Sequence, residues 1–136
     1  MIMKNFIALF LSITFLAIIS SCSSSPADMI TGEWQITDLQ TTSDIPEDQM
    51  EAYKEQIEEM KKSSKIYFKA DGSFEQTILE ETGTGTWKVS EDGKILTTDV
   101  DGNKEVKKIK ELSSDKMVLV LEFDDNKTTT TLEKVK

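Results

Sequence analysis

Eight short segments in which apolar and polar residues largely alternate constrain the fold of this chain more than any other feature. An alternation with a period of two places apolar side chains on one face of a β-strand. The segments span residues 33–40, 65–70, 73–80, 84–90, 94–100, 103–112, 116–123 and 127–135. The alternation is less regular in 94–100 and 103–112, and the last segment is polar and rich in threonine. Between consecutive segments lie Asp71-Gly72, Asp92-Gly93 and Asp101-Gly102, which are strong signals of two-residue hairpin turns. The sequence therefore predicts a mainly β chain.

The order of these segments favours a closed barrel over other β architectures. The last seven segments follow one another without a helical interruption, as in an up-and-down meander. Eight antiparallel strands with one apolar face close most simply into a barrel, because closure removes the exposed strand edges. A two-sheet sandwich is the alternative. We predict an eight-stranded antiparallel up-and-down barrel.

One amphipathic helix is expected between the first and second strands, over residues 46–62. Ser43 or Asp44 is placed to cap it, and Pro46 suits its first turn. We expect its apolar stripe to pack against the barrel, although methionines would also suit an adaptable partner-binding surface. The stripe, with residues at steps of three and four, consists of Met50, Tyr53, Ile57 and Met60.

The N-terminal residues have the layout of a secretory signal peptide, with Lys4 before an apolar run at 6–19. The run is shorter than the roughly 20 residues of a transmembrane anchor, which is the alternative. The closing Ile-Ser-Ser-Cys resembles the lipobox of bacterial lipoproteins, which implies that Cys22 is acylated and becomes the mature N-terminus. We expect three segments in the chain: a signal peptide over 1–21, a lipidated tether over 22–29 and a barrel domain over 30–136.

The charge and residue inventory exclude several classes of partner and cofactor. The chain has 25 acidic and 16 basic residues, no histidine and a single cysteine. Nucleic-acid phosphates need a basic patch, so we expect no nucleic-acid partner. With Cys22 acylated, neither an internal disulfide nor a Cys/His metal site could form, and we expect no metal and no other cofactor.

The residues needed for catalysis are also scarce, and we predict that the protein is not an enzyme. The sequence has no histidine, and no serine stands in a nucleophile-elbow context. The acidic pairs Glu80-Glu81 and Asp124-Asp125 lie at predicted turns, where solvated charge is expected. Residues 99–105 alternate like the start of a calcium loop, but the positions of glycine and glutamate do not fit, and a hairpin explains them better. Residues 83–85 are too short for a phosphate-binding loop.

Several short motifs resemble one known family. Gly32-Glu33-Trp34 at the start of the first strand matches the Gly-x-Trp motif of lipocalins. Residues 68–74, 85–87 and 109–119 resemble the small lipocalin-like domains of lipoproteins from Bacteroidota. The resemblance covers residues 30–135 and implies a lipocalin-like barrel.

The resemblance also implies roles for individual residues. In lipocalins the motif tryptophan, here Trp34, plugs the closed end of the barrel beneath a basic side chain of the last strand. The usual arginine is absent, so Lys134 or Lys136 would supply the cation–π contact. A helix after the first strand is a departure from lipocalins and is similar to the helices that cover the barrel mouth in fatty-acid-binding proteins.

The barrel interior is the candidate site. Eight-stranded barrels either fill with side chains or hold one small ligand. For the residues expected to face inward, we favour a packed core over a cavity lining. The residues expected to face inward are Trp34, Phe68, Phe74, Ile78, Trp87, Leu96, Met117, Leu119 and Leu121, of which Trp34, Phe68, Phe74, Trp87 and Leu119 are the tentative ligand-cavity or core residues.

These observations lead to one functional prediction and one alternative. We predict a lipid-anchored lipoprotein of the bacterial cell envelope, held in the outer membrane and facing the periplasm, whose non-catalytic barrel binds a small apolar ligand. The alternative is a structural or protein-interaction module with a solid barrel, whose partner is another envelope protein. An apolar cavity beneath the helix would favour the first prediction, and a filled interior with an exposed helix stripe would favour the second.

Overall fold

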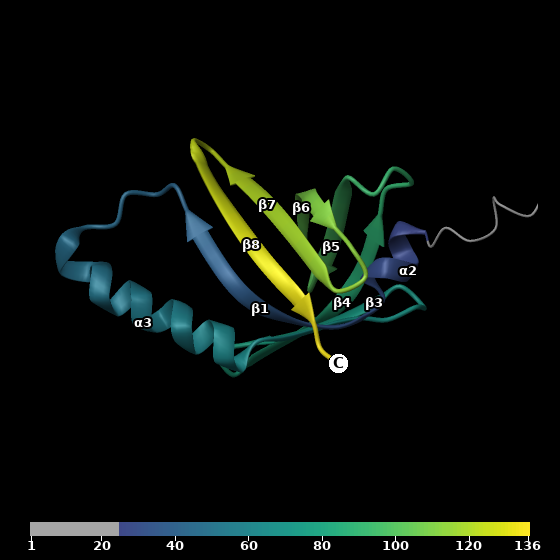
Figure 1. Cartoon of the computed structure of the whole chain (residues 1–136), viewed down its shortest axis with the longest axis horizontal. Coiled ribbons are helices and arrows are strands. Elements are labelled where there is room, and N and C mark those ends of the chain that lie inside the picture. The colour runs from purple at the N-terminus through teal and green to yellow at the C-terminus, as the bar shows by residue number, and fades with distance from the viewer. Residues whose placement is uncertain (1–24) are drawn as a thin grey trace, which may run out of the picture.

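The computed structural model describes residues 25–136, so the predicted signal peptide and Cys22 lie outside the described residues. Eight antiparallel strands close into one barrel, in which each strand pairs with the next along the chain and β8 pairs with β1 (Figure 1). The predicted up-and-down barrel is confirmed. The strands are β1 (Gly32–Thr41), β2 (Lys65–Phe68), β3 (Ser73–Ile78), β4 (Glu81–Val89), β5 (Ile95–Val100), β6 (Asn103–Leu112), β7 (Lys116–Phe123) and β8 (Asn126–Lys134).

The helix between the first two strands, α3 (Glu47–Ser63), lies where the apolar periodicity placed it. Its N-cap residue is Pro46, and no side chain caps it, so the expected cap by Ser43 or Asp44 was wrong. Ser43 is instead held at the end of β1, where its backbone N–H donates to Thr41 Oγ1 at 3.3 Å.

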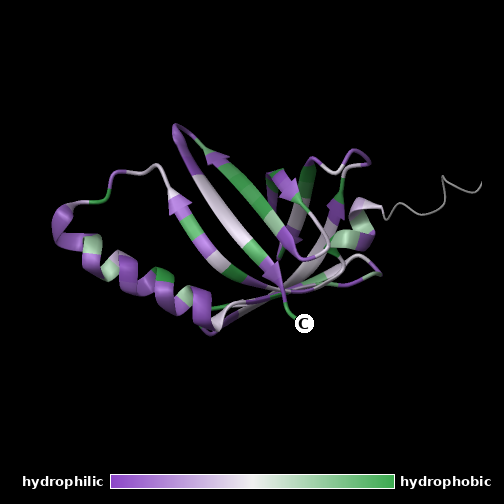
Figure 2. Ribbon diagram, viewed as in Figure 1, coloured by the Kyte–Doolittle hydropathy of each residue, from purple (hydrophilic) through white to green (hydrophobic). Residues whose placement is uncertain are grey.

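Only the C-terminal part of α3 packs on the barrel. None of its residues is fully buried, and of its apolar stripe Met60 packs against the core. The helix contacts β1 and β3, and in Figure 1 its N-terminal end lies away from the strands. Its residues are otherwise mainly hydrophilic (Figure 2). Of the stripe, Met60 at the C-terminal end is thus the residue that reaches the barrel core.

A second, short helix, α2 (Pro26–Ile30), replaces most of the expected tether. Ser25 caps it by accepting a hydrogen bond from the backbone N–H of Asp28 at 3.2 Å, and Pro26 occupies its first turn. Ile30 is completely buried, which anchors α2 at one end of the barrel. The sequence analysis did not predict this helix, because a helix this short shows no apolar periodicity, only its serine–proline start.

The core lies toward the end of the barrel that α2 covers. Its aromatic centre is Phe68, whose ring centroid lies 5.1 Å from that of Phe74 and 5.3 Å from that of Trp87. Of the residues expected to face inward, Ile78 and Leu121 are partly buried and the others are buried. The core also contains residues that were not among those candidates, namely Ile30, Ile36, Ile66, Ile109 and Leu132.

A cavity at the open end of the barrel

The two ends of the barrel differ. At the end we call closed, α2 and the aromatic core fill the space between the β2–β3, β4–β5 and β6–β7 connections. At the opposite, open end, a cavity of about 360 Å³ extends into the barrel. It is lined by Ile36, Leu39, Met60, Ile66, Gln76, Ile78, Thr98, Val100, Asp101, Asn103, Glu105, Lys107, Leu119, Leu121, Thr128, Thr130 and Leu132.

One part of the cavity wall is apolar. It comes from six strands and α3, and its β1 and β7 part, which we call the β1–β7 wall, consists of Ile36, Leu39, Leu119 and Leu121. Thr128 and Thr130 of β8 lie between these two strands. Met60 of α3 adds to this wall from the side of the mouth. Of the five candidate cavity or core residues, only Leu119 lines the cavity, whereas the four aromatic ones lie among the buried core residues.

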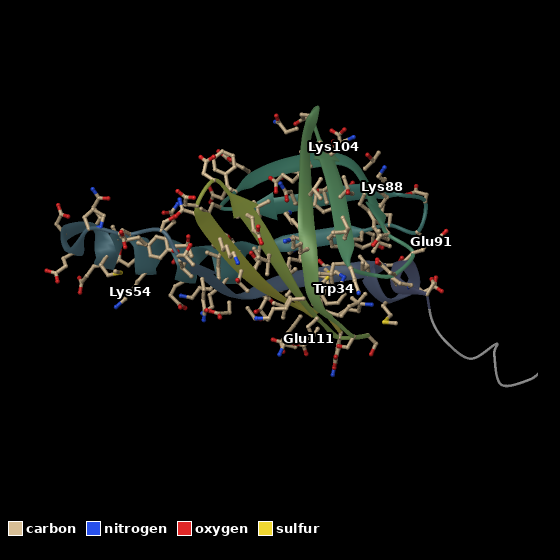
Figure 3. All side chains as sticks on the ribbon, turned by 90° about the horizontal axis from the view of Figure 1, so that it is seen from above. Trp34, Lys54, Lys88, Glu91, Lys104 and Glu111 are labelled. Carbon is tan, nitrogen blue, oxygen red and sulfur yellow. The ribbon has the colours of Figure 1, made fainter. Side chains whose placement is uncertain are left out.

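Another part of the wall is polar, and it is centred on β6. Alternate residues of this strand, Asn103, Glu105 and Lys107, line the cavity, and Ile109 continues the same face into the core. The intervening Lys104 and Val106 are exposed on the outer face, and Figure 3 shows Lys104 at the surface of the molecule. The sequence interpretation missed this inward face because none of its first three residues is apolar.

A local signal could have revealed the orientation of β6. The Asp101-Gly102 turn pairs Val100 with Asn103, and both line the cavity. Because directly opposed residues of an antiparallel pair share a face, the inward face of β5 determines that of β6. An inward Leu96 thus implies an inward Lys107, its partner in the pairing.

Two charges meet on this polar wall. Lys107 Nζ lies 3.2 Å from Glu105 Oε2, and the two side chains are 22% and 50% exposed, respectively. Thr98, which is 4% exposed, lies opposite Glu105 in the β5–β6 pair. On β8, Thr128 and Thr130 add hydroxyl groups to the lining. The cavity can therefore accommodate an apolar body and also hydrogen-bond a polar group.

Two glycines, Gly83 and Gly85, allow β4 to lie close to β5. Gly83 and Gly85 pair with Gln76 and Phe74 of β3. A Cβ atom on Gly85 would lie 1.7 Å from the carbonyl oxygen of Asp99, so no side chain fits between β4 and β5 at this point. These glycines are thus part of a paired strand, as we expected when we excluded a phosphate-binding loop.

The closed end is held by polar contacts around Trp34. The indole Nε1–H of Trp34 donates to the carbonyl of Ile30 at 2.7 Å, and Lys134 Nζ lies 5.1 Å from the ring centroid. Lys134 Nζ also donates to the carbonyls of Met29 at 2.8 Å and Thr31 at 3.1 Å. Of the two lysines expected to cover Trp34, the structure selects Lys134.

The glycine of the Gly-x-Trp motif serves the same arrangement. Gly32 has a φ of +138°, a conformation that L side chains rarely adopt. A Cβ atom there would lie 3.3 Å from Lys134 Cε, so glycine leaves space for the lysine side chain that extends over Trp34.

A family model described as a lipocalin-like domain matches residues 30–119. The chain belongs to this lipocalin-like family.

Solved structures show the same fold. The chain is similar to a DUF4847-family protein from Bacteroides vulgatus, with 15% identity over 79% of this chain and 96% of that one and a TM-score of 0.55. It is also similar to a lipocalin-like protein from Bacteroides uniformis, with 18% identity over 79% of this chain and 99% of that one and a TM-score of 0.51. No curated protein matches the chain.

In this lipocalin-like protein, the groups with shifted pKa values lie outside the cavity. Hydrogen bonds from the hydroxyls of Ser73 and Ser90, and from nearby backbone N–H groups, lower the pKa values of Asp71 and Asp92, respectively. A hydrogen bond from Lys108 and its positive charge lower the pKa of Glu122. All three carboxylates are solvent-exposed, so these shifts reflect turn and surface structure rather than a reaction centre.

Residues 25–136 contain no cluster of three or more acidic, cysteine or histidine side chains placed to hold a metal ion. Residues 99–105, which alternate like a calcium loop, form the β5–β6 hairpin, with Asp101 and Gly102 at positive φ. Neither α2 nor α3 is long and apolar enough to cross a membrane.

Proposed function

We propose that this lipocalin-like protein is a lipid-anchored protein of the bacterial cell envelope whose barrel binds one small, largely apolar ligand without transforming it. The observation that carries the proposal is the cavity at the open end, with its wall of Ile36, Leu39, Leu119 and Leu121. Its volume of about 360 Å³ falls within the range of pockets that hold small molecules, about 300–1,000 Å³.

The anchor is proposed from the sequence. The charged start, the apolar run and Cys22 support acylation, and acyl chains stabilise membrane attachment by about 0.8 kcal/mol per buried methylene. We place the barrel in the periplasm at the outer membrane. Metabolic labelling with a fatty-acid analogue should mark the wild-type chain and leave Cys22→Ala unlabelled and either unprocessed or soluble. Equal labelling of both chains would refute the anchor.

Ligand binding can be tested by native mass spectrometry of residues 23–136, purified from bacterial extract after circular dichroism has shown a folded β structure. An adduct that is present in the native spectrum and absent from the denatured one is the expected result. Its mass would identify the ligand.

A pair of variants makes this test specific to the cavity. Thr130 lines the cavity, so Thr130→Phe places a ring in it. The neighbouring Thr129 does not line the cavity, and Thr129→Phe is the matched control. We expect Thr130→Phe to lose the adduct and Thr129→Phe to keep it. Retention of the adduct by both variants would place the ligand elsewhere on the protein.

The alternative function is an interaction module. In its favour, the apolar stripe of α3 is only partly buried, and Met50 and Tyr53 line a shallow hollow between the helix and residues 39–45. The open cavity counts against the solid barrel that this alternative assumed. A clean apo mass, repeated after incubation with envelope lipids, would favour the interaction module and direct the search to protein partners.

A further inference from the structure

We infer that the ligand of this barrel is a small amphipathic carboxylate, bound with its carboxylate at Lys107 and its apolar chain against the β1–β7 wall. This inference rests on the proposed function and specifies its ligand. The apolar wall alone would accept a hydrocarbon of any kind. The polar group is selected by the wall that β6 presents to the cavity, with Lys107 as its innermost polar residue.

The first argument is the position of Lys107. Lysines rarely turn inward in a barrel, because desolvating an ammonium is costly unless it has a partner. At the closed end, Lys134 bonds the carbonyls of Met29 and Thr31. At the open end, Lys107 contacts one oxygen of Glu105 at 3.2 Å. An ammonium has three donors, so Lys107 has donors left for a group that enters the cavity.

The second argument is the order of charges along β6. Asp101 and Glu105 stand nearer the mouth, whereas Lys107 is two residues further along the strand toward the core. The side chain of Lys107 is 22% exposed and that of Glu105 is 50% exposed. Because water screens the outer charges more strongly, an entering ligand interacts more strongly with Lys107. A ligand carboxylate can therefore accept a hydrogen bond from Lys107 while the side chain of Glu105 turns toward solvent.

The third argument is size. A cavity of about 360 Å³ corresponds to roughly a dozen water molecules at about 30 Å³ each. This volume suits a chain of roughly ten carbons and excludes a two-chain lipid from complete enclosure. Thr98, which is almost fully buried opposite Glu105, adds a hydroxyl beside the position of the carboxylate.

The test compares three ligands with the same ten-carbon chain: decanoate, decanol and decyltrimethylammonium. The full chain, as processed by a Gram-negative host, is reconstituted in uncharged phosphatidylcholine vesicles. Binding of each radiolabelled ligand is measured by equilibrium dialysis, with protein-free vesicles subtracted. The variants are Lys107→Met, Glu105→Gln and, as a matched control on the outer face of the same strand, Lys104→Met.

We expect decanoate to bind at least tenfold more tightly than decanol, because a hydrogen bond to a charged group contributes about 1.5–3 kcal/mol and 1.4 kcal/mol is a factor of ten. Lys107→Met should remove this preference while decanol still binds. Glu105→Gln should tighten decanoate binding, because the competing carboxylate is gone. Lys104→Met should match the wild type.

Three results would overturn the inference. Equal affinities for decanoate and decanol that Lys107→Met does not alter would overturn the role of Lys107 and leave the apolar-ligand function standing. If decyltrimethylammonium bound most tightly, recognition of the ligand's polar group would be assigned to Asp101 and Glu105 near the mouth instead. Binding of none of the three ligands would overturn the inference, and the native mass spectrometry of residues 23–136 would then decide whether the proposed function stands.

Discussion

Lys134 Nζ lies 5.1 Å from the centroid of the Trp34 ring, and the two residues are direct partners in the β1–β8 pair that closes the barrel. Both side chains also bond to the end of α2: Trp34 to the carbonyl of Ile30, and Lys134 to those of Met29 and Thr31. The negative end of a helix favours a cation. This one lysine therefore joins β8, β1 and α2.

Loss of the lysine should weaken the closed end. Lys134→Met removes a cation–π contact and two hydrogen bonds from a charged donor, so we expect the free energy of unfolding in urea to fall by about 2–3 kcal/mol. Lys134→Arg should cost less than about 1 kcal/mol, because the guanidinium can bond both carbonyls and stack on the ring. Lys136→Met, at an exposed position, is the control and should leave stability unchanged. An equal loss in the Lys134 and Lys136 variants would contradict this assignment.

Trp34 should contribute through both its volume and its N–H group. The side chain is completely buried, so Trp34→Ala should cost about 3–5 kcal/mol. Trp34→Phe keeps an aromatic ring in the core and should cost less. Its expected cost of about 1–3 kcal/mol arises because the buried carbonyl of Ile30 loses its donor. Urea denaturation followed by circular dichroism gives both values. Tyr67→Ala, at a position 43% exposed, should be close to neutral. A neutral Trp34→Ala would remove Trp34 from the core.

Two glycines on β4 should respond differently to an added methyl group. At Gly85 the new Cβ would lie 1.7 Å from the carbonyl oxygen of Asp99, so the β4–β5 pairing must move. At Gly83 it would lie 2.9 Å from Val100 Cγ1, a side-chain atom that a rotamer change can displace. Gly85→Ala should lower the unfolding free energy by about 3 kcal/mol or more, and Gly83→Ala by about 1 kcal/mol. Similar costs would show that β4 and β5 can separate at Gly85 without loss.

The strands were predictable because their signals are local. Asp-Gly turns and short apolar alternations place every strand boundary within a few residues of its observed position, as at 116–123 for β7. The same alternation indicated the expected inward residues but missed Ile36, Ile66, Ile109 and Leu132 of the core. The Gly-x-Trp motif and a basic last strand were also sufficient to pair Trp34 with either Lys134 or Lys136, but the choice between them needed the register of β8.

The polar side of the cavity was not predictable from the alternation of apolar and polar residues. An inward face is normally recognised by its apolar residues, so Glu105 and Lys107 were read as part of an irregular strand. The threonines of β8 were read as polar without a direction, although Thr128 and Thr130 line the cavity. The cavity itself depends on how much space the side chains leave across eight strands, which no local pattern contains.

The closed end should also respond to acid through its turns. Asp71 Oδ1 accepts hydrogen bonds from the hydroxyl of Ser73 at 2.6 Å and its backbone N–H at 2.9 Å, which lower the pKa of Asp71. Asp92 Oδ1 makes the equivalent contacts with the hydroxyl of Ser90 at 2.6 Å and the N–H of Lys94 at 3.0 Å, and the pKa of Asp92 is lowered too.

The direction of the pH effect follows from these shifts. A carboxyl whose pKa is lower in the folded state stabilises the fold above its unfolded pKa of about 4, and this contribution is lost as the pH falls through the folded pKa. The wild type should therefore lose more stability between pH 5 and pH 2.5 than the Asp71→Asn/Asp92→Asn double variant, which cannot titrate there. Thermal unfolding at both pH values measures this difference. Ser73→Ala, which keeps the Asp71 carboxylate and removes its shortest donor, should reduce the pH dependence to a smaller extent. Identical losses in wild type and double variant would assign the acid sensitivity to other carboxylates.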